Sequence, residues 1–116
     1  MDDAIDGIND ALSEYDRKVQ RIMEPEEVIA EIIQICKRMS ANQVILFGSR
    51  AKGTNLERSD IDIAVSGVRH FEELREKIEE IPTLYMIDVL NLDKCKNEEI
   101  LEDIRIYGRK VYEKVS

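Results

Sequence analysis

Two short motifs in this chain have the residue types and the spacing for phosphoryl chemistry. Gly48 and Ser49 are separated by ten residues from Asp60, Ile61 and Asp62. A glycine-serine turn can present free backbone N–H groups to phosphate oxygens. Two carboxylates two residues apart on a strand point to the same side, and they repel each other unless a cation is bound. Mg²⁺ is the natural candidate, because it takes carboxylate oxygens at about 2.0–2.1 Å and shares its other positions with water and substrate phosphates.

A third acid fits the same chemistry. Asp88 lies at the centre of the apolar run of residues 85–90, where we expect it to be a buried charge. An aspartate on the solvated face of an edge strand is common, and a glycine-serine turn alone says little. A purely structural explanation must nevertheless account for the glycine-serine turn, the Asp60–Asp62 pair and Asp88 together, in this order along the chain. We therefore expect Asp60, Asp62 and Asp88 to converge on one patch beside the Ser49 turn.

The residues around the first motif predict a strand followed by a turn. Residues 44–47 form an apolar run that is too short for a helix and should end at Gly48. Ser49 suits the N-cap of a short helical turn, whose N–H groups and positive dipole end attract an anion. Arg50 and Lys52 add positive charge near the phosphates.

The residues around the second motif predict another strand. Residues 59–65 alternate, so that Asp60 and Asp62 face one side while Ile61 and Ile63 face the other. The two carboxylates should therefore lie side by side at the surface of a sheet.

The remaining periodic segments predict helices that alternate with these strands. Pro25 suits the first turn of a helix running to about Met39, and residues 71–81 repeat with helical spacing before Pro82. A third helix over residues 98–107 should stop at Gly108, before a short apolar end at residues 111–112. Such an order predicts an α/β (α+β) fold with a small mixed β-sheet and helices packed mainly on one face.

The stretch GSRAKGTNLERSDID, followed by Asp88, resembles the minimal nucleotidyltransferases of the DNA polymerase beta-like superfamily. The resemblance covers residues 26–112 and implies a nucleotidyltransferase domain over residues 25–116, with residues 1–24 as an extension. Such proteins are often encoded beside a HEPN partner as toxin and antitoxin, and the chain is similar to the antitoxins of these pairs.

The resemblance also implies roles for the motif residues. Asp60, Asp62 and Asp88 would be catalytic and hold two Mg²⁺ ions, with Asp88 helping to activate an attacking hydroxyl. The nucleotide would be bound by a second group of residues, namely Gly48, Ser49, Arg50 and Lys52. The expected reaction is transfer of AMP from ATP to a tyrosine of a HEPN toxin. The alternative is a non-catalytic nucleotide-binding antitoxin that neutralises its partner by surface contact.

The composition limits the number of domains, the class of partner and the kinds of cysteine and metal site. The 116 residues, 43% of them hydrophobic, support one domain with one modest core. A net charge of −8 argues against broad electrostatic binding to nucleic acid and favours a protein partner with a basic surface. The two cysteines do not form a disulfide framework, and the single histidine, His70, argues against zinc and is expected at a helix start.

The N-terminal residues carry two further expectations. They lack a secretory signal, and no apolar run approaches a membrane span of ~20 residues, so we expect a cytoplasmic protein. Six apolar residues form a narrow heptad seam that predicts an amphipathic helix, namely Ile5, Ile8, Leu12, Tyr15, Val19 and Ile22. This helix could mediate a homodimer or a partner contact, or it could pack on its own domain.

Overall fold

A computed structural model describes residues 23–115 of the chain, so the predicted heptad seam lies outside the described residues. The elements follow in the order α2 (Pro25–Arg38), β1 (Gln43–Phe47), α3 (Gly48–Lys52), β2 (Ile61–Ser66), α4 (Phe71–Glu79), β3 (Ile87–Asn91), the 3₁₀ turn η1 (Leu92–Lys94), α5 (Glu98–Tyr107) and β4 (Arg109–Glu113). Among these helices, none is long and apolar enough to cross a membrane.

The four strands form one mixed sheet in the order β3-β2-β1-β4. β1 pairs antiparallel with β2 and with β4, whereas β2 and β3 run parallel. A parallel pair needs a crossover connection, and α4 supplies it. The predicted mixed sheet of an α+β fold is therefore confirmed.

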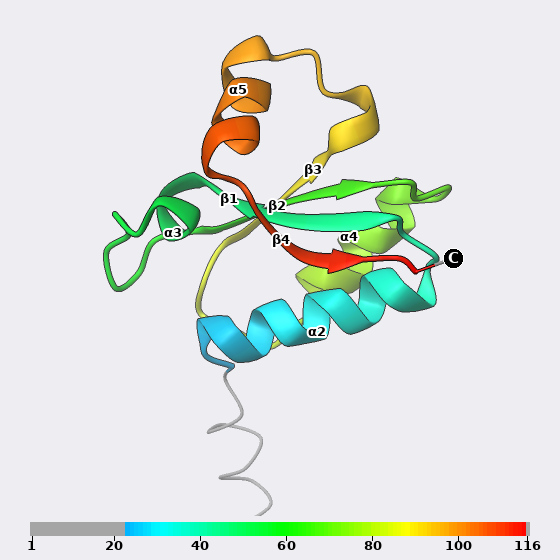
Figure 1. The fold of residues 1–116 in the computed structure, drawn as a ribbon. Coiled ribbons are helices and arrows are strands. Elements are labelled where there is room, and N and C mark those ends of the chain that lie inside the picture. The colour runs from blue at the N-terminus through cyan, green and yellow to red at the C-terminus, as the bar shows by residue number, and fades with distance from the viewer. Residues whose placement is uncertain (1–22, 116) are drawn as a thin grey trace, which may run out of the picture.

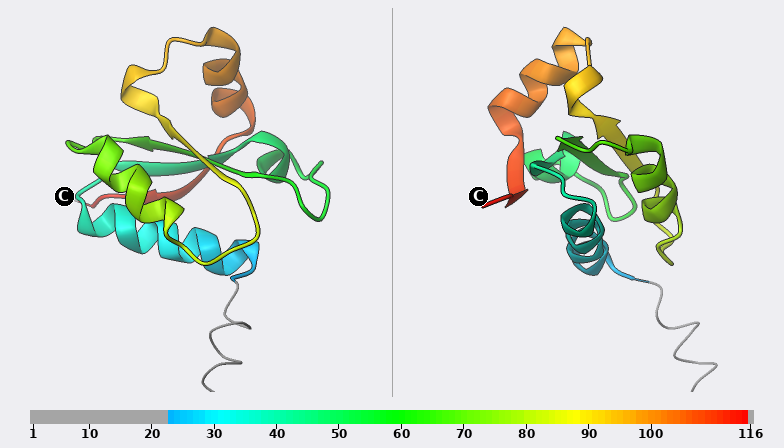
Figure 2. Two further views of the ribbon diagram at one scale, coloured as in Figure 1. Left: turned by 180° about the vertical axis from the view of Figure 1, so that it is seen from behind. Right: turned by 90° about the vertical axis from the view of Figure 1, so that its right-hand side faces the viewer.

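Helices α2 and α4 cover one face of the sheet, and α5 lies on the other side (Figures 1 and 2). The core lies between the sheet and the α2–α4 pair, where Ile32 of α2, Leu74 of α4 and both Ile61 and Ile63 of β2 are fully buried. These residues recur with helical or alternating spacing in the sequence, which is why each element has one apolar face. Because Ile61 and Ile63 face this core, Asp62 between them must face the α5 side.

The helix boundaries follow local sequence signals. Pro25 occupies the first turn of α2 as predicted, because its missing N–H has no partner to lose there. The Asn97 side chain caps α5 by accepting hydrogen bonds from the backbone N–H groups of Glu99 and Ile100. The same helix ends where Gly108 follows, as the sequence predicts.

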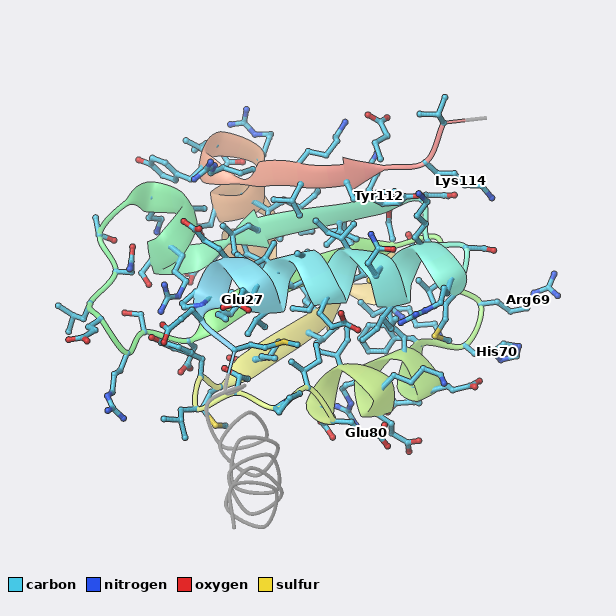
Figure 3. All side chains as sticks on the ribbon, turned by 90° about the horizontal axis from the view of Figure 1, so that it is seen from below. Glu27, Arg69, His70, Glu80, Tyr112 and Lys114 are labelled. Atoms are coloured by element: carbon cyan, nitrogen blue, oxygen red, sulfur yellow. The ribbon has the colours of Figure 1, made fainter. Side chains whose placement is uncertain are left out.

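His70 and the two cysteines lie where the sequence places them. His70 occupies the N-cap position of α4 and points away from the body of the domain, beside Arg69 (Figure 3). Cys36 is fully buried in α2, and burial raises the pKa of its thiol to about 12. Cys95 follows η1 and is partly exposed, and both cysteines are free.

Candidate active site

The site begins where β1 turns sharply into α3. Gly48 has a φ of +72°, and a Cβ atom at this position would overlap Asp62 Oδ2. Glycine is required here both for the left-handed backbone and for the close approach of the carboxylate. The prediction that Ser49 caps the helix is wrong. α3 starts one residue earlier, at Gly48, and Phe47 occupies the N-cap position without a side-chain hydrogen bond.

The acids of β2 and β3 lie next to each other. Asp62 and Asp88 are paired in the register of the two parallel strands, so their side chains share a face of the sheet. Asp60 directly precedes β2 and is exposed. The expectation of a buried charge at Asp88 is wrong, because β3 is at the edge of the sheet and its aspartate is exposed.

Asp62 is partly buried, whereas Asp60 and Asp88 are exposed. Burial raises the pKa of Asp62 to about 6, and the negative charges of Asp88 and Asp60 add to this effect. A raised pKa means that the ionised form is disfavoured until a positive charge is nearby. The charges of Asp88 and Asp60 thus both act on Asp62, which lies against Gly48.

Lys52 connects α3 to α5. Its Nζ lies 2.7 Å from Asp103 Oδ1 and 5.2 Å from the centroid of the Tyr107 ring. The hydrogen bond to Asp103 raises the pKa of Lys52, and Asp103 is also one of the charges that raise the pKa of Asp62. The α5 side of the site was not predicted. The signal was the four-residue spacing of Asp103 and Tyr107, which places both on one face of a helix.

Arg50 faces away from this cation. Its guanidinium donates hydrogen bonds to the backbone carbonyl oxygens of Ser59 and Glu57, in the loop that leads into Asp60. The sequence predicts that Arg50 and Lys52 both lie beside the phosphates, whereas in the structure their side chains reach different segments, the loop before Asp60 and α5.

The acidic side chains of the site are the groups that could hold a metal ion. Within residues 23–115, no three His, Cys, Asp or Glu side chains are already gathered around a common point. The residues nevertheless fit a hard divalent cation such as Mg²⁺, because Asp62 and Asp88 offer carboxylate oxygens from adjacent register positions. A bound cation would favour the ionised form of Asp62, whose pKa burial raises.

Residues 30–116 match the family described as Polymerase beta, Nucleotidyltransferase. The chain belongs to this family. The nucleotidyltransferase match includes the Gly48 turn, all three acids and the α5 face. No curated protein sequence matches the chain.

Solved structures share the nucleotidyltransferase fold. A toxin–antitoxin crystal structure with AMP-PNP superimposes with a TM-score of 0.60 at 23% identity, covering 73% of each chain. A mutant of the toxin–antitoxin MntA-HpeT gives a TM-score of 0.59 at 21% identity, also over 73% of each chain. A second mutant of that complex gives 0.58 at 23% identity, over 73% of this chain and 72% of the other.

Proposed function

We propose that this chain is a metal-dependent nucleotidyltransferase that moves AMP from ATP to a tyrosine hydroxyl of a HEPN toxin and thereby acts as its antitoxin. The observation that carries the proposal is the register pairing of Asp62 and Asp88 beside the Gly48 turn. Carboxylates on adjacent strands, next to a turn with free N–H groups, suit a reaction that must bind a triphosphate and deprotonate a hydroxyl.

Each residue has a task in this reaction. The backbone amides at Ser49 and Arg50, together with the ammonium group of Lys52, orient the terminal phosphates. Asp88 is exposed at the sheet edge, where it can accept the proton of an incoming hydroxyl. The hydroxyl oxygen then bonds to the α-phosphorus of ATP as the bond to pyrophosphate breaks.

Mg²⁺ fits the carboxylate side of the site. Asp60, Asp62 and Asp88 would hold two Mg²⁺ ions. Bound there, the ions would neutralise charge on the triphosphate and lower the pKa of the attacking hydroxyl. Removal of divalent metal with EDTA should abolish AMP transfer, and added Mg²⁺ should restore it.

The acceptor is inferred from charge and from the structural relatives. A net charge of −8 disfavours an RNA or DNA acceptor, because phosphate-rich polymers are repelled. The similar solved structures are toxin–antitoxin complexes, one of them with AMP-PNP, an analogue of ATP. A protein hydroxyl on a toxin partner accounts for both observations.

Transfer is tested with the full chain, a HEPN protein encoded beside it, Mg²⁺ and ATP labelled on the α-phosphate. The partner should gain mass in whole AMP units on tyrosine and lose ribonuclease activity. A variant that combines Asp60→Ala, Asp62→Ala and Asp88→Ala should lose the transfer, whereas Glu73→Ala on the exposed surface of α4 should retain it. If the triple variant still neutralises the partner and wild type adds no mass, surface contact alone is the function.

A further inference from the structure

The side chain of Arg50 leaves α3 and reaches the loop that precedes Asp60. Its Nε and Nη2 donate hydrogen bonds of 3.1 and 2.8 Å to the Ser59 carbonyl oxygen, and Nη2 also lies 3.3 Å from that of Glu57. Ser59 immediately precedes Asp60. The guanidinium therefore holds the peptide group through which this aspartate joins the loop.

Ser59 is also the centre of the loop's own hydrogen bonds. Its hydroxyl accepts a 2.8 Å hydrogen bond from Leu56 N, and its N–H donates to Leu56 O at 3.2 Å. These bonds shape a local turn but do not connect it to the rest of the domain. Arg50 makes that connection, because it extends from α3.

The same guanidinium touches the segment that precedes Asp88. Its Cζ lies 5.1 Å from the centroid of the Tyr85 ring, and the Tyr85 hydroxyl donates to Glu24 Oε2 at 3.2 Å. Next to Tyr85, Met86 accepts a 2.8 Å backbone hydrogen bond from Ile61 N. One side chain thus contacts the segments before both strands that carry the acids.

We propose that Arg50 is a positioning residue that sets the separation of Asp60 from the Asp62–Asp88 pair, an assignment that rests on the proposed function of this site. Arginine suits the role because its planar fork stays charged, donates to two carbonyl groups at once and stacks on an aromatic ring. A lysine has one compact ammonium group and cannot replace this combination. The side chain acts through the backbone and does not bind phosphate itself.

The first test measures backbone hydrogen exchange in the full chain. Arg50→Lys should accelerate exchange at the amides of Ser59 and Ile61, because the loop loses its attachment to α3. Arg58→Lys is the matched control: it lies in the same loop and makes no hydrogen bond or ion pair within residues 23–115. Unchanged exchange in Arg50→Lys overturns the proposal.

The second test measures Mn²⁺ binding by electron paramagnetic resonance in the absence of nucleotide. Residues that orient metal ligands typically change metal affinity by about 10–100-fold, so Arg50→Lys should weaken Mn²⁺ binding by about that factor. A residue that only bound phosphate would leave this affinity unchanged, and so should Arg58→Lys. Guanidinium ion added to Arg50→Ala should restore Mn²⁺ affinity, whereas methylammonium should not.

The outcomes separate this proposal from the proposed function. Faster exchange with unaltered Mn²⁺ affinity overturns the positioning role and leaves Arg50 as a loop anchor. If wild type binds Mn²⁺ but transfers no AMP, the proposed function fails while the Arg50 comparison still stands. If wild type binds no Mn²⁺, the metal assignment and the positioning role that depends on it both fail.

Discussion

At the scale of single residues, Asp62 couples the chemistry of the site to the stability of the fold. Its pKa is raised from 3.8 to about 6, so between these values the folded chain binds a proton that the unfolded chain has lost. The folded state therefore loses stability as the pH rises through this window, and the full loss is present above it.

We expect Asp62→Asn to be more stable than wild type near neutral pH and to lose this advantage below about pH 4. The gain should be about 1–2 kcal/mol, after allowance for the solvent that still reaches the carboxylate. Urea unfolding of both proteins at the two pH values measures the gain. An equal gain at both values would show that the Asp62 charge is not its source.

Gly48 and Gly53 form a matched pair for testing the turn. Both have positive φ, +72° and +78°, but a Cβ at Gly53 would meet no atom within 4 Å, whereas one at Gly48 would overlap Asp62 Oδ2. Gly53→Ala should cost about 1–2 kcal/mol of stability from the backbone alone. Gly48→Ala should cost somewhat more and should also displace the Asp62 carboxylate.

Thermal shifts caused by ATP and Mg²⁺ should therefore disappear in Gly48→Ala and persist in Gly53→Ala. If the two variants respond alike, the approach of Asp62 to the turn is not required for nucleotide binding.

At the scale of elements, α3 and α5 are joined by the Lys52–Asp103 ion pair and by the approach of Lys52 to the Tyr107 ring. The side chains of Lys52 and Asp103 are 35% and 25% exposed, so solvent screens the pair only in part. We expect a double-mutant cycle of Lys52→Ala and Asp103→Ala to give a coupling energy of about 0.2–1 kcal/mol that falls in high salt.

The two single variants should differ in nucleotide binding. Lys52→Ala should weaken ATP binding, because it removes the cation, whereas Asp103→Ala should preserve or tighten it, because it removes a competing negative charge. Isothermal titration with ATP and Mg²⁺ measures both. A loss in Asp103→Ala as large as that in Lys52→Ala would assign Asp103 a direct part in binding.

At the scale of the whole molecule, the core formed by residues 23–115 begins at Val28, with Met23 packed against it. Met23, where the described residues begin, is tied to the loop before β3: its N–H donates to Pro82 O, and its carbonyl oxygen accepts from the Thr83 hydroxyl. A chain that begins at Met23 should therefore keep its melting temperature within a few degrees and still bind ATP.

The same truncation tests the predicted heptad seam. If the seam mediates association, removal of residues 1–22 should reduce the number of chains per particle. Light scattering measures this number from the particle mass. A protein that is monomeric both before and after the deletion would favour packing of the segment on its own chain.

The helices and strands that the sequence predicts are those marked by their own residues, through helix-boundary residues or through alternation of apolar and polar side chains. Pro25 and Gly108 mark helix boundaries through backbone chemistry, and alternation of Ile61 and Ile63 with Asp60 and Asp62 identifies the second strand. The expectation that Asp62 and Asp88 lie on one patch rested on the order of the motifs, and the register that pairs them comes from the structure. Local rules were therefore sufficient for the helix boundaries and for the second strand.

What sequence reasoning missed depends on contacts between elements. The partner of Arg50 is set by how the 54–60 loop folds back on α3, and the partner of Lys52 by where α5 lies, far along the sequence. Ser49 satisfies the composition rule for a cap, but α3 already starts at Gly48 and has Phe47 at the N-cap position. Asp88 looks buried in an apolar run, yet strand order places it at an edge.

The burial of Cys36 allows selective labelling of the other cysteine, Cys95. With its thiol enclosed in α2 and a pKa of about 12, it has almost no thiolate at neutral pH, so maleimide reagents should react at Cys95 alone among the two cysteines. Cys95 follows the turn directly after β3, the strand that carries Asp88. The natural sequence thus provides a single attachment point for a fluorophore that can report on nucleotide and partner binding without any engineered cysteine.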